Sequence, residues 1–193
     1  MLRRANQGDT IIEVMFAFAV FSLVIVSAVV LMNQGVAMAQ RSLEISLVRQ
    51  QIDSQITMVQ HAKQIKSPAW AALQADAQDT IGDFNSIATC PDSSTLGPAH
   101  AHFMTVTNTA KKDITLQNIS SANYSESTAY AMVDVMMRTA SLPRAYGLWM
   151  VLVKAEGYAT NRAYDLHVRA CWPSVGVNQP ITIGTVTRMY DEK

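Results

Sequence analysis

The sequence predicts an α+β fold, in which one long N-terminal α-helix packs on a small C-terminal antiparallel β-sheet head. Three observations support this class. The 27 residues from Val14 to Gln40 carry no charged side chain. An apolar stripe then continues at helical spacing as far as Val59, and three runs rich in β-branched residues follow residue 147. A helix and a sheet that each have one apolar face can bury those faces against each other.

The first half of the helix is predicted to cross a membrane, over residues 12–33. From Val14 to Met32 every residue is apolar except two serines. At about 1.5 Å per residue, these positions nearly cross a hydrocarbon core of about 30 Å. Glu13 stands at the edge of this segment. A carboxylate there is costly without a partner, which makes it a functional candidate; the alternative is that it lies among the lipid headgroups.

The second half of the helix is predicted to be amphipathic, so that one helix covers residues 9–66. Its apolar positions recur at steps of 3, 4, 4 and 3, which is typical of one buried helix face. These positions are Ile45, Val48, Ile52, Ile56 and Val59, widened by Leu43 and Leu47. No proline occurs before Pro68. A coiled-coil stalk is the alternative interpretation of this stripe.

The head is predicted over residues 67–193, with an antiparallel meander at about 146–190. A short helix is expected near Ala69–Gln78, and short strands near His102–Val106 and Ile114–Leu116. Residues 127–139 suit either a short helix or a strand.

The meander is predicted from three β-branched runs separated by turn residues. These runs are Leu148–Ala155, Tyr164–Cys171 and Ile181–Tyr190. In the second run Tyr164, Leu166, Val168 and Ala170 share one face, which we expect to lie on the helix stripe.

The charge pattern predicts that the N-terminus stays in the cytoplasm and the head is exported. Arg3 and Arg4 precede the apolar segment, and the next basic residue is Arg41. Cys90 and Cys171 are the two cysteines of the chain. An even count in an exported domain suggests a disulfide; the alternative is two buried thiols.

The segment from Gly8 to Val26, Gly-Asp-Thr-Ile-Ile-Glu-Val-Met-Phe and onward, resembles the class III signal peptide of type IV pilins and pseudopilins. The resemblance covers about 30 residues. It implies a leader at residues 1–8, cleavage by a prepilin peptidase between Gly8 and Asp9, and N-methylation of Asp9. Glu13 then becomes the fifth residue of the mature chain, the position of the family's assembly glutamate. The implied partners are the membrane, other pilin subunits, the prepilin peptidase and the pilus assembly platform.

The residues from Glu13 to Ser22 resemble minor pilins of the PilV type more than major pilins, and two departures from the family pattern also indicate a minor subunit. Asp9 stands where the family usually has phenylalanine, and Val30 stands where major pilins often have proline. The family also implies the helix-plus-sheet fold, a place in the cytoplasmic membrane with the head outside, and a place on the cell surface after assembly into a type IV pilus or secretion pseudopilus.

Other functions have weaker support in the sequence. His100 and His102 lack further metal ligands at suitable spacing, so we expect no metal site and a solvated loop. We find no nucleophile or phosphate-loop motif and expect neither an enzyme nor a cofactor. The basic residues of the head are scattered, and the net charge is zero, so nucleic-acid binding is possible but unsupported. The alternatives to a pilin are a cleaved secretory signal and a single-pass anchored binding domain that never polymerises.

Overall fold

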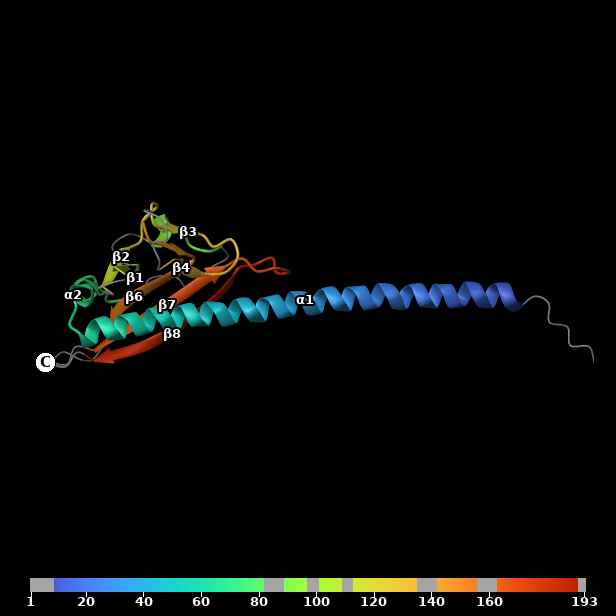
Figure 1. Cartoon of the computed structure of the whole chain (residues 1–193), viewed down its shortest axis with the longest axis horizontal. Helices are drawn as coiled ribbons and strands as arrows, with labels where there is room; N and C mark the ends of the chain where they lie inside the picture. Colours follow the sequence, from blue (N-terminus) through green and yellow to red (C-terminus); the bar gives the residue numbers. More distant parts are fainter. Residues whose placement is uncertain are drawn as a thin grey trace, which may run out of the picture. The chain divides into compact units, whose positions relative to one another are not determined.

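The computed structural model describes residues 9–81, 89–96, 101–108, 113–134, 142–155 and 163–190. Contacts divide the chain into two compact units, residues 1–42 and 43–193. Helix α1 (Asp9–Gln64) contributes to both (Figure 1). The predicted α+β class is confirmed, because a long N-terminal helix is followed by a C-terminal antiparallel sheet.

The second half of α1 buries one regular stripe in the core of the head. The buried positions recur at steps of 4, 3, 4 and 3: Val48, Ile52, Gln55, Val59 and Ala62. This differs from the predicted stripe, because Ile45 and Ile56 are only partly buried. The prediction that Leu43 widens the stripe is wrong, since its side chain is 61% exposed.

Helix α1 ends in a closed turn that leads directly into a second helix. Lys66 adopts a left-handed conformation with φ 48°, and the Ser67 N–H donates to the Ala62 carbonyl at 2.9 Å. These are features of a Schellman motif, which satisfies the last helix carbonyls. Ser67 then caps α2 (Pro68–Ala75) by accepting a hydrogen bond from the Trp70 N–H. The short helix expected near residues 69–78 is therefore present.

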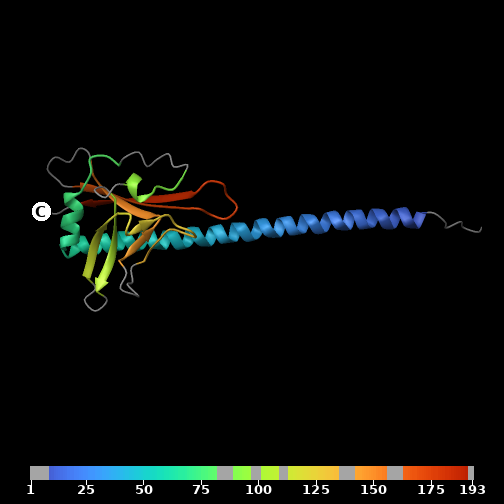
Figure 2. The same ribbon diagram turned by 90° about the horizontal axis from the view of Figure 1, so that it is seen from above.

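The main sheet has five antiparallel strands in the order β2-β1-β6-β7-β8 (Figures 1 and 2). They are β1 (His102–Asn108), β2 (Asp113–Asn118), β6 (Leu148–Lys154), β7 (Ala163–Trp172) and β8 (Ile181–Tyr190). The β6-β7-β8 meander confirms the three predicted strands. The two expected strands nearer the N-terminus are also present and extend the same sheet.

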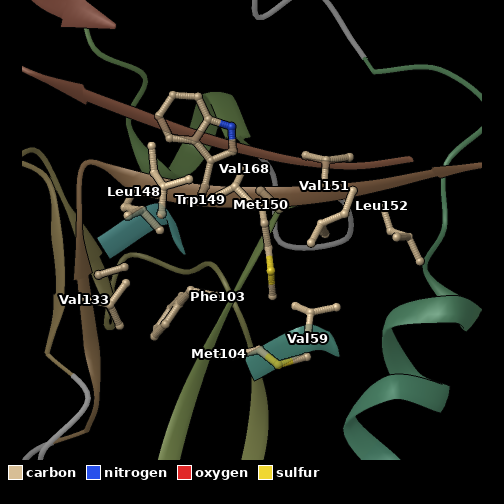
Figure 3. Close-up of a cluster of buried hydrophobic side chains, with 14 of the residues drawn as sticks. Val59, Phe103, Met104, Val133, Leu148, Trp149, Met150, Val151, Leu152 and Val168 are labelled. Atoms are coloured by element: carbon tan, nitrogen blue, oxygen red, sulfur yellow. The ribbon is translucent and has the colours of Figure 1, made fainter. Parts of the chain in front are cut away.

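Burial along the central strands follows from their position in the sheet. In β7, the four residues predicted to share one face are all buried. In β6, every residue from Leu148 to Leu152 is buried, so both faces of this strand are covered. The two faces are visible in Figure 3, where Met150 points toward Met104 and Val59 while Trp149 points to the opposite side.

A second, three-stranded sheet was not expected from the sequence. It consists of β3 (Tyr124–Ser125), β4 (Met132–Asp134) and β5 (Arg144–Tyr146), in the order β3-β5-β4. Residues 127–139 were expected to form either a short helix or a strand, and the strand is present as β4. Residues 135–139 of this segment lie outside the described residues. A third helix, α3 (Ser93–Leu96), precedes β1.

Candidate functional site

The first unit presents an apolar helix surface on every side. All residues of α1 from Ile11 to Val36 are exposed, including Phe16 at 72% and Leu31 at 67%. By length and composition, α1 is the one helix in the described part of the chain that could cross a membrane. Exposed aliphatic and aromatic surface on this scale marks a contact with lipid or with other proteins.

The two hydroxyl groups of this segment are satisfied within the helix. The Ser22 Oγ donates to the Phe18 carbonyl at 2.8 Å, and the Ser27 Oγ donates to the Leu23 carbonyl at 2.7 Å. This bonding to the carbonyl four residues earlier removes the need for a solvent partner. The serines therefore do not oppose placement of α1 in lipid, where an unpaired polar group is costly.

The predicted assembly residue Glu13 lies in the exposed first unit. It is the one charged residue of the chain between Asp9 and Arg41, and its side chain is exposed. Helix α1 begins at Asp9. The predicted leader, with Gly8 and the cleavage site before Asp9, lies outside the described residues, and the cleavage and methylation of this site remain predictions.

The head binds its part of α1 through a carboxylate that sequence reasoning missed. Glu44 accepts a hydrogen bond from the Trp172 indole N–H at 3.0 Å and one from the Ser174 hydroxyl at 2.6 Å. These bonds join the helix to the end of β7 and to the segment that follows it. The spacing in the sequence could have identified it, because Glu44 lies four and eight residues before the buried Val48 and Ile52 and so shares their face of the helix.

Two glutamines one turn apart also bind the head, and through backbone groups. The Gln55 amide donates to the Met104 carbonyl at 3.1 Å and accepts from the Met104 N–H at 2.8 Å. Gln51 accepts from the Val133 N–H at 3.4 Å. Helix α1 therefore supplies hydrogen-bond partners to β1 and β4 as well as apolar contacts.

Gln55 bonds the backbone of Met104 in β1 near the point where the pairing of β1 with β6 ends. The described register between β1 and β6 consists of His102 opposite Met150. At the other end of β6, away from Met104, the Gln78 N–H donates to the Leu152 carbonyl at 2.8 Å. Because Gln55 bonds both backbone groups of Met104, this buried residue keeps its hydrogen bonds where β1 and β6 separate.

A disulfide joins Cys90 and Cys171, with an S–S distance of 2.10 Å. Cys171 is fully buried in β7. The bond therefore ties the segment before α3 to the end of β7, next to Trp172.

The histidine candidates do not form a metal site in the described residues. His102 is 1% exposed within β1, and its Nδ1 lies 3.1 Å from the Asn118 Oδ1. The expectation of a solvated loop is therefore wrong for His102, because the strand carries it into the core; His100 lies outside the described residues. Among the described residues, no group of three or more metal-binding side chains gathers.

Several basic side chains of the head are held by acidic partners. Both Arg188 guanidinium bonds to Asp165 measure 2.7 Å, and the Lys154 ammonium lies 3.0 Å from Asp79. The Arg188 hydrogen bonds lower the pKa of the Asp165 carboxyl. Burial lowers the pKa of Arg169. The Arg144 guanidinium donates to the Ala122 carbonyl at 3.1 Å. Four further basic residues of the head lie outside the described residues: Lys111, Lys112, Arg138 and Arg162.

An open hollow of about 780 Å³ lies between the end of α1, α2 and the end of β8. Two hydroxyl-bearing residues line it, Ser67 and Tyr190. Ser67 is the cap of α2, and its oxygen accepts a hydrogen bond from the Trp70 N–H. The rest of the lining consists of lysine, arginine, glutamine and apolar side chains.

No protein-family model, no curated protein and no solved structure matches this chain.

Proposed function

We propose that this chain is a type IV pilin-like structural subunit, of the minor kind, that is cut after Gly8 and assembles through the first half of α1. The observation that carries the proposal is the apolar helix surface from Ile11 to Val36, exposed on all sides with Glu13 as its single charge. A surface of this kind is stable in lipid and equally stable among other apolar helices. It therefore suits a subunit that leaves the membrane for a helical bundle.

Glu13 gives such a bundle a defined register. Cleavage after Gly8 would free an α-amino group on Asp9, four residues before Glu13, which is about 6 Å along a helix. Pairing of the Glu13 carboxylate with the amine of a neighbouring copy would then fix the axial offset between the two chains. A buried ion pair is better suited to fixing register than to adding net stability.

Removal of the leader is tested by the intact mass of the protein purified from membranes. The mass of a chain that begins at Asp9, with one methyl group on its amine, is the expected result. A chain that retains residues 1–8 would contradict the proposal and favour a single-pass anchored domain that does not polymerise.

The assembly role of Glu13 is tested by Glu13→Gln, with Asp53→Asn as the matched control. Both changes neutralise an exposed acid on α1, and Asp53 lies in the second unit. We expect both variants to reach the membrane and only Glu13→Gln to be lost from filaments sheared from the cells. Equal amounts of both variants in the sheared fraction would refute the role of Glu13.

A further inference from the structure

Strand β8 forms one edge of the main sheet, and this edge is long and unprotected. Its ten residues pair with β7 without a bulge, and no other described strand lies beside it (Figure 1). The strand contains no proline, and its one charged residue, Arg188, is bound to Asp165. Proteins usually protect a sheet edge with proline, lysine or a bulge, because a bare edge pairs with other chains. The other edge strand, β2, has six residues, and α2 lies against it.

The backbone hydrogen bonds of β7 show which groups of β8 face outward. The Cys171 N–H donates to the Gly147 carbonyl at 2.7 Å, and the Ala163 carbonyl accepts from the Ala155 N–H at 2.9 Å, so the odd-numbered residues of β7 bond on the side of β6. Because bonding alternates along a strand, the even-numbered residues of β7 bond to β8, where their partners are odd-numbered. The even-numbered residues of β8 therefore turn their N–H and C=O groups away from the sheet. No described turn or loop supplies a backbone partner to four of these residues, all of them exposed: Thr182, Gly184, Val186 and Tyr190.

The hollow beside the end of β8 adds a charge preference to this edge. Its lining includes the last three residues of β8, together with Lys63 from the last turn of α1 and Lys66 from the turn that follows. Among the described residues, no acid lines the hollow or forms an ion pair with either lysine. The free edge therefore leads, at its C-terminal end, into an open and positively charged hollow of about 780 Å³.

We propose that the free edge of β8 binds an extended segment of another protein by antiparallel strand addition, with an acidic side chain of that segment in the hollow beside Lys63 and Lys66. In this mode of recognition, main-chain hydrogen bonds supply affinity and side-chain pockets supply specificity. The N-terminal end of an antiparallel segment lies at the C-terminal end of β8, so the acidic residue precedes the added strand. The strand itself is neutral and β-branched, to match the exposed Thr182 and Val186. All residues of this surface belong to the second unit.

The charge pattern favours a different chain over a second copy of this one. Antiparallel pairing of two β8 strands about Val186 would bring the residues that precede β8 in the second copy to the hollow. These residues, 173–180, include no acidic side chain. Both lysines would then remain without a counter-charge.

The test uses the full chain in detergent micelles and the synthetic peptide acetyl-Asp-Asp-Thr-Val-Thr-Val-Thr-amide as the probe. We expect the peptide to slow amide hydrogen exchange several-fold at Thr182, Gly184 and Val186. Exchange at Ile183 and Thr185 should already be slow without it, because their N–H groups bond to β7. The same peptide with each valine and threonine nitrogen methylated cannot donate along its strand, and we expect it not to bind.

Two pairs of variants separate the edge from the hollow. Val186→Pro removes an outward N–H and blocks the edge, whereas Val186→Thr keeps a β-branched residue as the matched control. Proline is tolerated on an edge strand where its nitrogen faces solvent, so both variants should fold, which their melting temperatures check. We expect only Val186→Pro to weaken peptide binding, by about tenfold. Lys63→Gln should weaken it several-fold, whereas Arg144→Gln removes an exposed charge outside the hollow and should not.

Unchanged exchange at Thr182, Gly184 and Val186, or equal binding of the methylated peptide, would overturn strand addition without reliance on any variant. Equal binding by Lys63→Gln and Arg144→Gln would overturn the preference for an acidic segment. A dimer in sedimentation that protects the outward amides without peptide would overturn the choice of partner, since a second copy would then occupy the edge. These measurements do not depend on cleavage after Gly8, so their failure is distinct from failure of the proposed function.

Discussion

Replacement of Gln55 by leucine is expected to destabilise the head more than any exposed change on the same helix. Gln55 is fully buried, and its amide forms two hydrogen bonds with the backbone of Met104, which is also fully buried. Leucine fills a similar volume but can neither donate nor accept. The change would therefore leave one N–H and one C=O of β1 without their partner.

The magnitude follows from the two abandoned backbone groups. Each buried polar group left unsatisfied costs about 1–3 kcal/mol, so the pair costs about 2–6 kcal/mol. The more apolar side chain returns about 1–2 kcal/mol through burial. We expect a net loss of about 3 kcal/mol, which corresponds to a fall in melting temperature of about 6–12 °C for a domain of this size.

The assay is thermal unfolding of the full chain in detergent micelles, followed by near-ultraviolet circular dichroism. Gln50→Leu is the matched control, because it replaces a glutamine by leucine at an exposed position of the same helix. Its effect should stay within about 0.5 kcal/mol. Amide hydrogen exchange supplies a local readout, since the Met104 N–H should lose protection only in Gln55→Leu.

Equal melting temperatures for the two glutamine variants would refute the reasoning. Such a result would mean that β1 re-pairs with β6 when the glutamine is lost. Retained protection of the Met104 N–H in Gln55→Leu would identify that rearrangement directly.

Three further outcomes are expected for the head. Glu44→Ala removes the acceptor of two hydrogen bonds and should cost about 2–3 kcal/mol in thermal unfolding, while Glu44→Gln should cost less because an acceptor oxygen remains. Arg188 lowers the pKa of Asp165, so this pair stabilises the fold at pH values above the unfolded pKa of about 3.9, and its contribution is lost as the pH falls through the folded pKa. Asp165→Asn removes this contribution at every pH, so the melting temperature of the variant should fall less than that of the unmodified chain on acidification below about pH 4. Replacement of Cys90 and Cys171 by serine opens a loop with a sequence separation of 81 and should lower the free energy of unfolding by about 4 kcal/mol in the chain-entropy model, measured by urea titration.

Sequence reasoning found the elements that have strong periodicity. The long helix and the β6-β7-β8 meander were expected, because each carries a clear apolar pattern. A short helix after Pro68 and strands near those of β1 and β2 were also expected. The three-stranded sheet was missed, since its strands are only two or three residues long. Periodicity needs a longer run than this to be recognised.

Within the helix stripe, the polar members were missed for a different reason. Gln55 and Glu44 are polar, so a search for apolar residues at helical spacing does not include them. Their burial is accounted for by hydrogen-bond partners that lie 49 residues away for Gln55 and at least 128 residues away for Glu44.

The sequence by itself determined that the first half of α1 is apolar on all sides and that its second half is amphipathic. An uncharged run long enough to cross a bilayer and a stripe at helical spacing are local properties of the chain, and so is the single acid at Glu13. The tertiary structure decided which polar groups of that stripe are buried, which strands share the sheet and where the uncharged 173–180 loop is held. Those features depend on hydrogen bonds between segments far apart in the chain, and no local pattern records which distant backbone group will need a partner.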